Sequence, residues 1–237
     1  MRPLALGIGS ILAAMAALGL SSCASRSAKR THLESFQAGL RQKTRLDAAW
    51  LFHEGDISNT AGVISSRYDD APWQKIHLPH DYVLSGDFSP ANSRNHGYLP
   101  YRPAWYRKHF LIPDSDHGKI LRLDFDGVFR DSQVWLNGQF LGRHASGYTP
   151  FSYDVTQVAR CGSENELTVR VDPRAFEGWW YEGGGIYRHV YFSALAPLHV
   201  SQWGTYVVSH VPRGDQGAGE QANLTIHTCV TNHAPQT

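Results

Sequence analysis

Cysteine, methionine and net charge are all scarce in this sequence of 237 residues. The three cysteines include no CxxC or Cys/His ligand spacing, and the 13 histidines form no convincing ligand set, so the sequence does not support a zinc site. Basic residues number 22 and acidic residues 21, which leaves no surplus of positive charge for binding nucleic acid. Two methionines and few periodic Leu-rich stretches argue against a helical bundle.

The first 22 residues have the pattern of a secretory signal peptide. Arg2 precedes an apolar run from Leu4 to Leu20, which falls just short of a transmembrane span and is interrupted by glycines. The following Leu-Ser-Ser-Cys resembles the bacterial lipobox, in which the cysteine thiol receives a diglyceride. By that resemblance Cys23 is the lipidated residue, and Ala24 in place of aspartate points to the outer membrane. We therefore predict an exported lipoprotein, periplasmic or anchored to the outer membrane, with residues 23–45 as a polar and basic tether.

Two cysteines remain after Cys23. Cys161 and Cys229 are able to pair in an oxidising compartment. Because Cys229 is expected in a later domain, we favour two separate thiols.

Apolar residues, which make up 42% of the chain with Tyr and Cys included, begin to alternate with polar ones from about Trp50 onward. This period of two is typical of half-buried antiparallel strands. Strands are expected at 73–78, 104–112, 121–125, 150–154, 167–171, 186–194 and 197–208. Asn137-Gly138 separates two apolar runs and predicts a hairpin with a type I′ turn, which needs positive φ at both central residues. With no long helical pattern between them, these segments predict an all-β sandwich.

A second unit is expected to begin near Pro197, where alternation resumes and continues over residues 223–230. A sandwich needs about seven strands and about 100 residues. Residues 197–237 are too few to close one, so we expect an incomplete domain whose apolar face is uncovered.

Four stretches together resemble a known family. They are LPHDY at 78–82, GYLPYRPAWYRKHF at 97–110, the segment 127–154 with DSQVWLNGQFLGRHASGYTPFSYDV, and WWYEGGGIYRHV at 179–190. In this order and spacing, over residues 46–200, the chain resembles the N-terminal sugar-binding domain of glycoside hydrolase family 2, which includes β-galactosidases, β-glucuronidases and β-mannosidases.

The resemblance implies a fold and a function. Residues 46–196 are expected to form a jelly-roll, galactose-binding-like β-sandwich, and residues 197–237 the start of an immunoglobulin-like sandwich. The family's catalytic (β/α)8 barrel, which carries both catalytic glutamates, has no counterpart here, so we assign no catalytic residue. The expected activity is hydrolysis of O-glycosidic bonds in a β-linked oligosaccharide or glycoside, most like a β-galactosidase, with this piece inactive alone. Metals used by some relatives bind mainly through the barrel, so we predict no metal here, and no cofactor.

In complete relatives, loops of the first domain contribute to the barrel's sugar pocket. The matching candidates here are Tyr101, Arg102, Glu177, Trp179, Trp180, Tyr181 and Glu182. Aromatic rings pack on sugar C–H faces, while charged groups pair with hydroxyls. The alternatives are packing of Trp179-Trp180 beneath the neighbouring glycines and a solvated Glu182. Many relatives have arginine at the position of Trp179, which leaves the sugar unidentified.

Other features have simpler interpretations. Gly183-Gly184-Gly185 is expected to allow positive φ or close backbone approach, with a phosphate cradle as the alternative. His80-Asp81 resembles half of a catalytic dyad but lacks a nucleophile partner, and we interpret it as a structural turn. Two further hypotheses stay open: a surface carbohydrate-binding lipoprotein, and one half of a split glycosidase.

Overall fold

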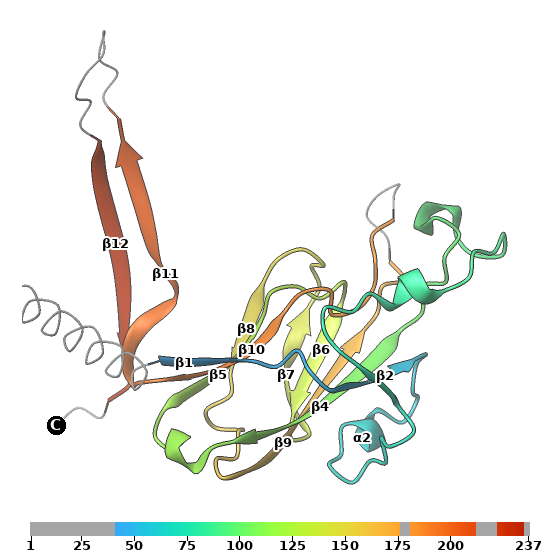
Figure 1. Ribbon diagram of the computed structural model, residues 1–237, viewed down its shortest axis with the longest axis horizontal. Helices are drawn as coiled ribbons and strands as arrows, with labels where there is room; N and C mark the ends of the chain where they lie inside the picture. The colour runs from blue at the N-terminus through green and yellow to red at the C-terminus, as the bar shows by residue number, and fades with distance from the viewer. Residues whose placement is uncertain (1–40, 176–180, 212–221, 235–237) are drawn as a thin grey trace, which may run out of the picture. The chain divides into compact units, whose positions relative to one another are not determined.

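The computed structural model describes residues 41–175, 181–211 and 222–234, and regular structure in these ranges is almost entirely β (Figure 1). The exceptions are one short helix, α2 (Thr60–Val63), and 3-10 turns at Tyr82–Ser85, Arg94–His96 and Asp114–Asp116. None of the helices in these ranges is long and apolar enough to span a membrane. The all-β prediction is confirmed.

The larger sheet of the sandwich has the strand order β3-β2-β4-β9-β6-β7 with antiparallel pairing throughout. Its strands are β2 (Trp50–Glu54), β3 (Gln74–Ile76), β4 (Ala104–Ile112), β6 (Ser132–Leu136), β7 (Gln139–His144) and β9 (Ser163–Val171). The β4 and β9 strands are long and pair over their whole length, from Ala104 opposite Val171 to Ile112 opposite Ser163. They lie in the middle of the sheet.

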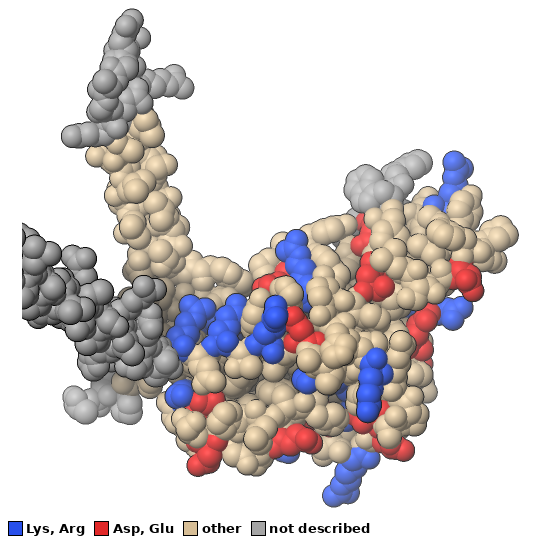
Figure 2. Space-filling model, in the orientation of Figure 1, with Lys and Arg blue, Asp and Glu red and all other residues tan. Residues whose placement is uncertain are grey.

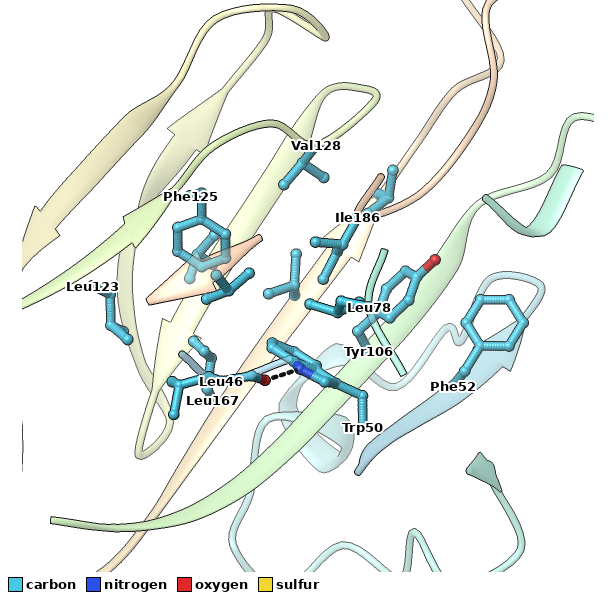
Figure 3. Packing of buried hydrophobic residues seen from close by; sticks show 14 of the residues in the cluster. Leu46, Trp50, Phe52, Leu78, Tyr106, Leu123, Phe125, Val128, Leu167 and Ile186 are labelled. Carbon is cyan, nitrogen blue, oxygen red and sulfur yellow. Dashed lines mark hydrogen bonds between the residues drawn. The ribbon is translucent and has the colours of Figure 1, made fainter. Parts of the chain in front are cut away.

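The second sheet has the order β1-β10-β5-β8. Its strands are β1 (Arg41–Arg45), β5 (Ile120–Phe125), β8 (Phe151–Asp154) and β10 (Val190–Leu195). Side chains of both sheets form one buried cluster, which includes Leu123 and Phe125 of β5, Leu167 of β9 and Tyr106 of β4. Figure 3 shows these side chains pointing into the core, where the Trp50 Nε1–H donates to the Leu46 carbonyl oxygen at 2.5 Å.

The predicted hairpin joins β6 to β7. Asn137 and Gly138 have φ angles of 53° and 80°, as a type I′ turn requires. Leu136 pairs with Gln139 across it. The Asn137 side chain also donates to the Val158 carbonyl oxygen at 2.9 Å, which ties the turn to the rest of the sandwich.

Several strand boundaries differ from the sequence-based expectation, two of them in ways that bear on the argument. Residues 41–45, assigned to the tether, form β1, whose side chains are all exposed, so no apolar alternation signals it. The strand expected at 186–194 begins only at Val190. Arg188 lies in an exposed bend before it and not on a strand.

The segment after the sandwich forms a two-stranded sheet, β11 (Leu198–His210) and β12 (Asn223–Asn232). Leu224, Ile226 and Val230 of β12 are exposed, as are Val200 and Val207 opposite them. The immunoglobulin-like domain expected from residue 197 stays a prediction, as do the other domain boundaries. Residues 1–40, including the signal segment and Cys23, lie outside the described residues.

Candidate functional site

Asp81 is the centre of a polar cluster that joins two loops of the sandwich. The Tyr181 hydroxyl donates to Asp81 Oδ2 at 2.6 Å, and the Gly184 backbone N–H donates to Oδ1 at 3.0 Å. The Val83 N–H donates to the same oxygen at 3.3 Å, which caps the turn at Tyr82–Ser85. Three donors therefore hold the carboxylate in place, which is the structural role that the sequence suggested.

His80 faces the core and not Asp81. Its Nδ1 lies 3.0 Å from the Tyr106 hydroxyl, and its ring contacts Phe52 with 4.7 Å between centroids. Burial lowers the pKa of His80, and the charge of Asp81 offsets this only in part. The imidazole is therefore neutral near pH 7 and packs as an aromatic ring, with no side-chain hydrogen bond to Asp81 among the described contacts.

Tyr101 ties the loop before β4 to the loop before β10. Its hydroxyl accepts from the backbone N–H groups of Glu182 and Gly183, both at 3.3 Å. Its ring stacks on His96 at 3.9 Å and meets Tyr181 edge-on at 6.4 Å. Three of the predicted site residues, Tyr101, Tyr181 and Glu182, are therefore neighbours, although 80 positions separate them in the sequence.

Arg102 lies at the margin of this cluster. Its carbonyl oxygen accepts from the Tyr82 hydroxyl, which fixes its backbone. Its guanidinium is exposed and 3.8 Å from Glu54, and a surface pair of this length is weak. Glu177, Trp179 and Trp180, the other predicted site residues, lie outside the described residues.

The three consecutive glycines permit close approach between the loops. Gly183 and Gly185 have φ angles of +86° and +117°, and a Cβ on Gly184 would lie 2.5 Å from Val83 Cγ2. Each of their N–H groups already donates to the protein: Gly183 to Tyr101, Gly184 to Asp81, and Gly185 to the Phe129 carbonyl oxygen at 2.7 Å. Because no amide is left for an anion, the phosphate-cradle alternative is wrong.

Comparison with known proteins agrees with this architecture. The family described as "Glycosyl hydrolases family 2, sugar binding domain" matches residues 36–195. The chain belongs to glycoside hydrolase family 2. Beta-galactosidase BoGH2A of Bacteroides ovatus is 39% identical over 195 residues, which cover 81% of this chain and 23% of that protein. A beta-glucuronidase of Formosa agariphila is 29% identical over 202 residues, covering 74% of this chain and 20% of the relative.

Solved structures of glycosidases share the fold. A beta-glycosidase from Bacteroides vulgatus superposes with a TM-score of 0.73 and 33% identity, covering 82% of this chain and 25% of that one. A family 2 member from Bacteroides cellulosilyticus gives a TM-score of 0.70 with 34% identity, over 81% of this chain and 25% of the other. The chain thus spans about a quarter of the length of these relatives and neighbours.

Two residues of this family 2 site were not predicted as part of it. His96 supplies the ring on which Tyr101 stacks, and Tyr82 holds the Arg102 backbone. His96 stands in a polar loop with no periodic pattern around it, so nothing in the sequence marks it. Tyr82 is in the LPHDY motif and was identified only as part of the family resemblance.

The Tyr181→Phe variant of this family 2 domain is expected to be less stable by about 1–2 kcal/mol, because a hydrogen bond to a charged acceptor is lost. Burial, with the hydrogen bond to Asp81 and its charge, raises the pKa of Tyr181 above its ordinary value of 10. The folded state therefore keeps this proton more tightly than the unfolded chain, and the resulting stability is present below pH 10 and lost as the pH rises further. Urea unfolding from pH 7 to 11 should show a shallower alkaline decline in the variant. Tyr98→Phe, at an exposed position, is the control and should change stability by less than about 0.5 kcal/mol.

Proposed function

We propose that this chain is the N-terminal, sugar-binding portion of a family 2 glycosidase, most like a β-galactosidase, that acts on β-linked oligosaccharides or glycosides. The hydrogen-bonded Asp81–Tyr101–Tyr181 cluster is the observation that carries this proposal. It holds the loops before β4 and β10 together, so the candidate sugar-contacting residues Tyr101, Tyr181 and Glu182 lie side by side. The names of the relatives, beta-galactosidase and beta-glucuronidase, support the substrate class.

The hydrogen bonds that these side chains already make within the protein indicate how each one would contact a sugar. The Tyr181 hydroxyl donates to Asp81, and the Tyr101 hydroxyl oxygen accepts two backbone N–H groups, so we expect the rings of both residues to supply most of their contact with a sugar. The charged groups of Arg102 and Glu182 are the candidates for hydroxyl recognition. A correctly placed pair discriminates between epimers, because the wrong epimer leaves buried polar groups unpaired.

Bond cleavage is assigned to residues outside this sequence. A retaining glycosidase needs two carboxyl groups about 5–5.5 Å apart, one as nucleophile and one as acid/base. Asp81, the carboxylate at the centre of the cluster, is saturated by three donors and is unsuited to either role. We therefore place both catalytic carboxylates in a barrel domain that this chain docks against and whose pocket its loops help to shape.

The purified 237-residue chain is expected to leave nitrophenyl β-D-galactoside and β-D-glucuronide unhydrolysed, and to resist labelling by a cyclophellitol aziridine, which reacts with a catalytic carboxylate. Turnover that follows the chain through successive columns and exceeds the empty-vector preparation would contradict the assignment. Reading the DNA downstream of codon 237 separates the remaining cases. A barrel in the same frame indicates one polypeptide, and a barrel in an adjacent frame indicates a split enzyme.

We also propose that the protein is an exported lipoprotein with lipid on Cys23, and that it is periplasmic or anchored to the outer membrane. The support is the lipobox-like sequence alone. Mass spectrometry of the protein purified from its bacterial host decides between a diacylglycerol-modified and an unmodified Cys23.

A further inference from the structure

A cleft of about 430 Å³ opens among loops of the sandwich and shares no lining residue with the cluster around Asp81. Pro79 follows β3, Asp126 follows β5, Pro150 precedes β8, and the remaining wall is the segment before β10. Its full lining is Pro79, Asp126, Pro150, Tyr187, Arg188 and His189. Its volume is in the range of small-molecule sites.

The cleft contains one acidic and one basic side chain that do not pair with other described residues. Neither Asp126 nor Arg188 has an ion pair or side-chain hydrogen bond within the described part of the chain. The Arg188 guanidinium instead lies against the Tyr187 ring, with 5.4 Å between the guanidinium carbon and the ring centroid. A carboxylate that only accepts and a guanidinium that only donates therefore face the same space.

The third polar group is oriented by a neighbour. His189 Nδ1 lies 2.7 Å from Asp47 Oδ2, so its other ring nitrogen, Nε2, is left for a ligand. In the tautomer whose Nδ1–H donates to Asp47 Oδ2, Nε2 accepts a hydrogen bond. The cleft thus offers two acceptors and one forked donor, which is a pattern suited to adjacent hydroxyls.

The apolar walls of the cleft are held rigidly. The Tyr187 hydroxyl donates to the Gly147 carbonyl oxygen at 2.8 Å, which anchors the ring. A Cβ on Gly127 would lie 3.0 Å from Arg188 Cδ and 3.0 Å from the Tyr187 hydroxyl, so the glycine leaves room for both side chains. The rings of Pro79 and Pro150 add surfaces with little conformational freedom to lose.

We propose that this cleft is a second carbohydrate site, which binds one neutral hexopyranose unit of a glycan. Asp126 and His189 Nε2 accept from its hydroxyls, Arg188 donates to a hydroxyl or ring oxygen, and Tyr187 and the prolines contact its C–H faces. Because Asp126 and Arg188 carry opposite charges, the cleft favours a neutral sugar over an anion. An anion that paired with Arg188 would leave the negative charge of Asp126 nearby without a partner. Such a site would hold a polymeric substrate at a second point, beyond the pocket that the loops around Tyr101 help to form.

The test is a protein-observed NMR titration of the 237-residue chain with methyl β-D-galactopyranoside. We expect shifts confined to the cleft residues and a dissociation constant of about 1 mM, as is usual for a ligand of this size. Asp126→Asn and Arg188→Ala should each weaken binding at least tenfold. Tyr98→Phe, at an exposed position that does not line the cleft, should leave it unchanged. Urea unfolding of each variant verifies that the fold is intact, and the wild-type shift map tests the site without any substitution.

Parallel titrations with sodium sulfate and D-glucuronate separate a sugar site from an anion site. Equal or tighter binding of either anion, dependent on Arg188 and not on Asp126, would overturn the proposal. So would galactoside shifts that centre on Tyr101 and Tyr181, or the absence of shifts in the cleft. Any of these results leaves the proposed role of the Asp81 cluster untouched, since that role rests on different residues.

Discussion

Arg107→Ala is expected to lower the free energy of unfolding by about 3–5 kcal/mol, the usual cost of breaking a buried ion pair from one side. The Arg107 side chain is fully buried in β4. Its Nε donates to Asp70 Oδ2 at 2.6 Å, and a terminal nitrogen lies 2.6 Å from Glu166 Oε2. Another terminal nitrogen donates to the Val63 carbonyl oxygen at the end of α2. Alanine would leave two carboxylates and a helix-end carbonyl without this donor, in a region with little access to water.

The loss of stability in Arg107→Ala should depend on pH. Burial tends to raise the pKa of Asp70, but hydrogen bonds from His109 and Arg107 outweigh it and hold that pKa below its ordinary value of 3.8. Such a depressed pKa contributes stability above pH 3.8 that is lost as the pH falls. In the variant, protonation of Asp70 removes a negative charge that Arg107 no longer balances, so the difference from wild type should shrink in acid.

Denaturant unfolding at pH 7 and in acid measures both effects. Arg174→Ala is the matched control, because Arg174 is largely exposed and Asp172 keeps Arg170 as a partner at 3.2 Å. It should cost less than about 1 kcal/mol. A similar small loss in Arg107→Ala would show that the buried network does not stabilise the fold.

Local alternation predicted most of the sandwich because its strands have one buried and one less buried face. Residues 104–112 were expected as a strand and form β4 with the same bounds. The Asn137-Gly138 turn was predicted from residues that tolerate positive φ. The strand β1 was not predicted, because it is held at the sheet edge by backbone pairing to β10 while its side chains are exposed. An edge strand held by backbone hydrogen bonds alone does not need the alternating apolar residues from which strands are predicted.

The site was harder to predict than the fold, since its contacts join residues far apart in the chain. Tyr101, Tyr181 and Glu182 were proposed through a family resemblance, and their proximity is a property of the folded loops. The hydrogen bond from Tyr181 to Asp81 spans 100 positions. The buried Arg107 network could not be predicted for the same reason, because its partners Asp70 and Glu166 are far from Arg107 in the chain.

The tightest backbone approach in these loops is at Gly185, and Gly185→Ala is expected to cost about 3 kcal/mol or more. A φ of +117° strains any residue with a Cβ, and that atom would lie 2.4 Å from the Tyr106 hydroxyl and 2.6 Å from the His80 carbonyl oxygen. Relief requires the two loops to separate. That movement would disrupt the reciprocal hydrogen bonds between Gly185 and Phe129, at 2.7 and 2.9 Å, and pull Gly184 from Asp81.

Gly97→Ala separates the effect of backbone angle from that of contact. Gly97 also has a positive φ, +64°, but a Cβ there would meet nothing within 4 Å. We expect it to cost about 1 kcal/mol, the price of the left-handed conformation alone. Urea unfolding compares the two variants, and near-ultraviolet circular dichroism reports whether the tyrosines of the cluster keep their packing. Equal losses of unfolding free energy in Gly185→Ala and Gly97→Ala would mean that the loops can accommodate a Cβ at Gly185. The close approach of the backbone would then not be what holds Tyr101, Tyr181 and Glu182 together.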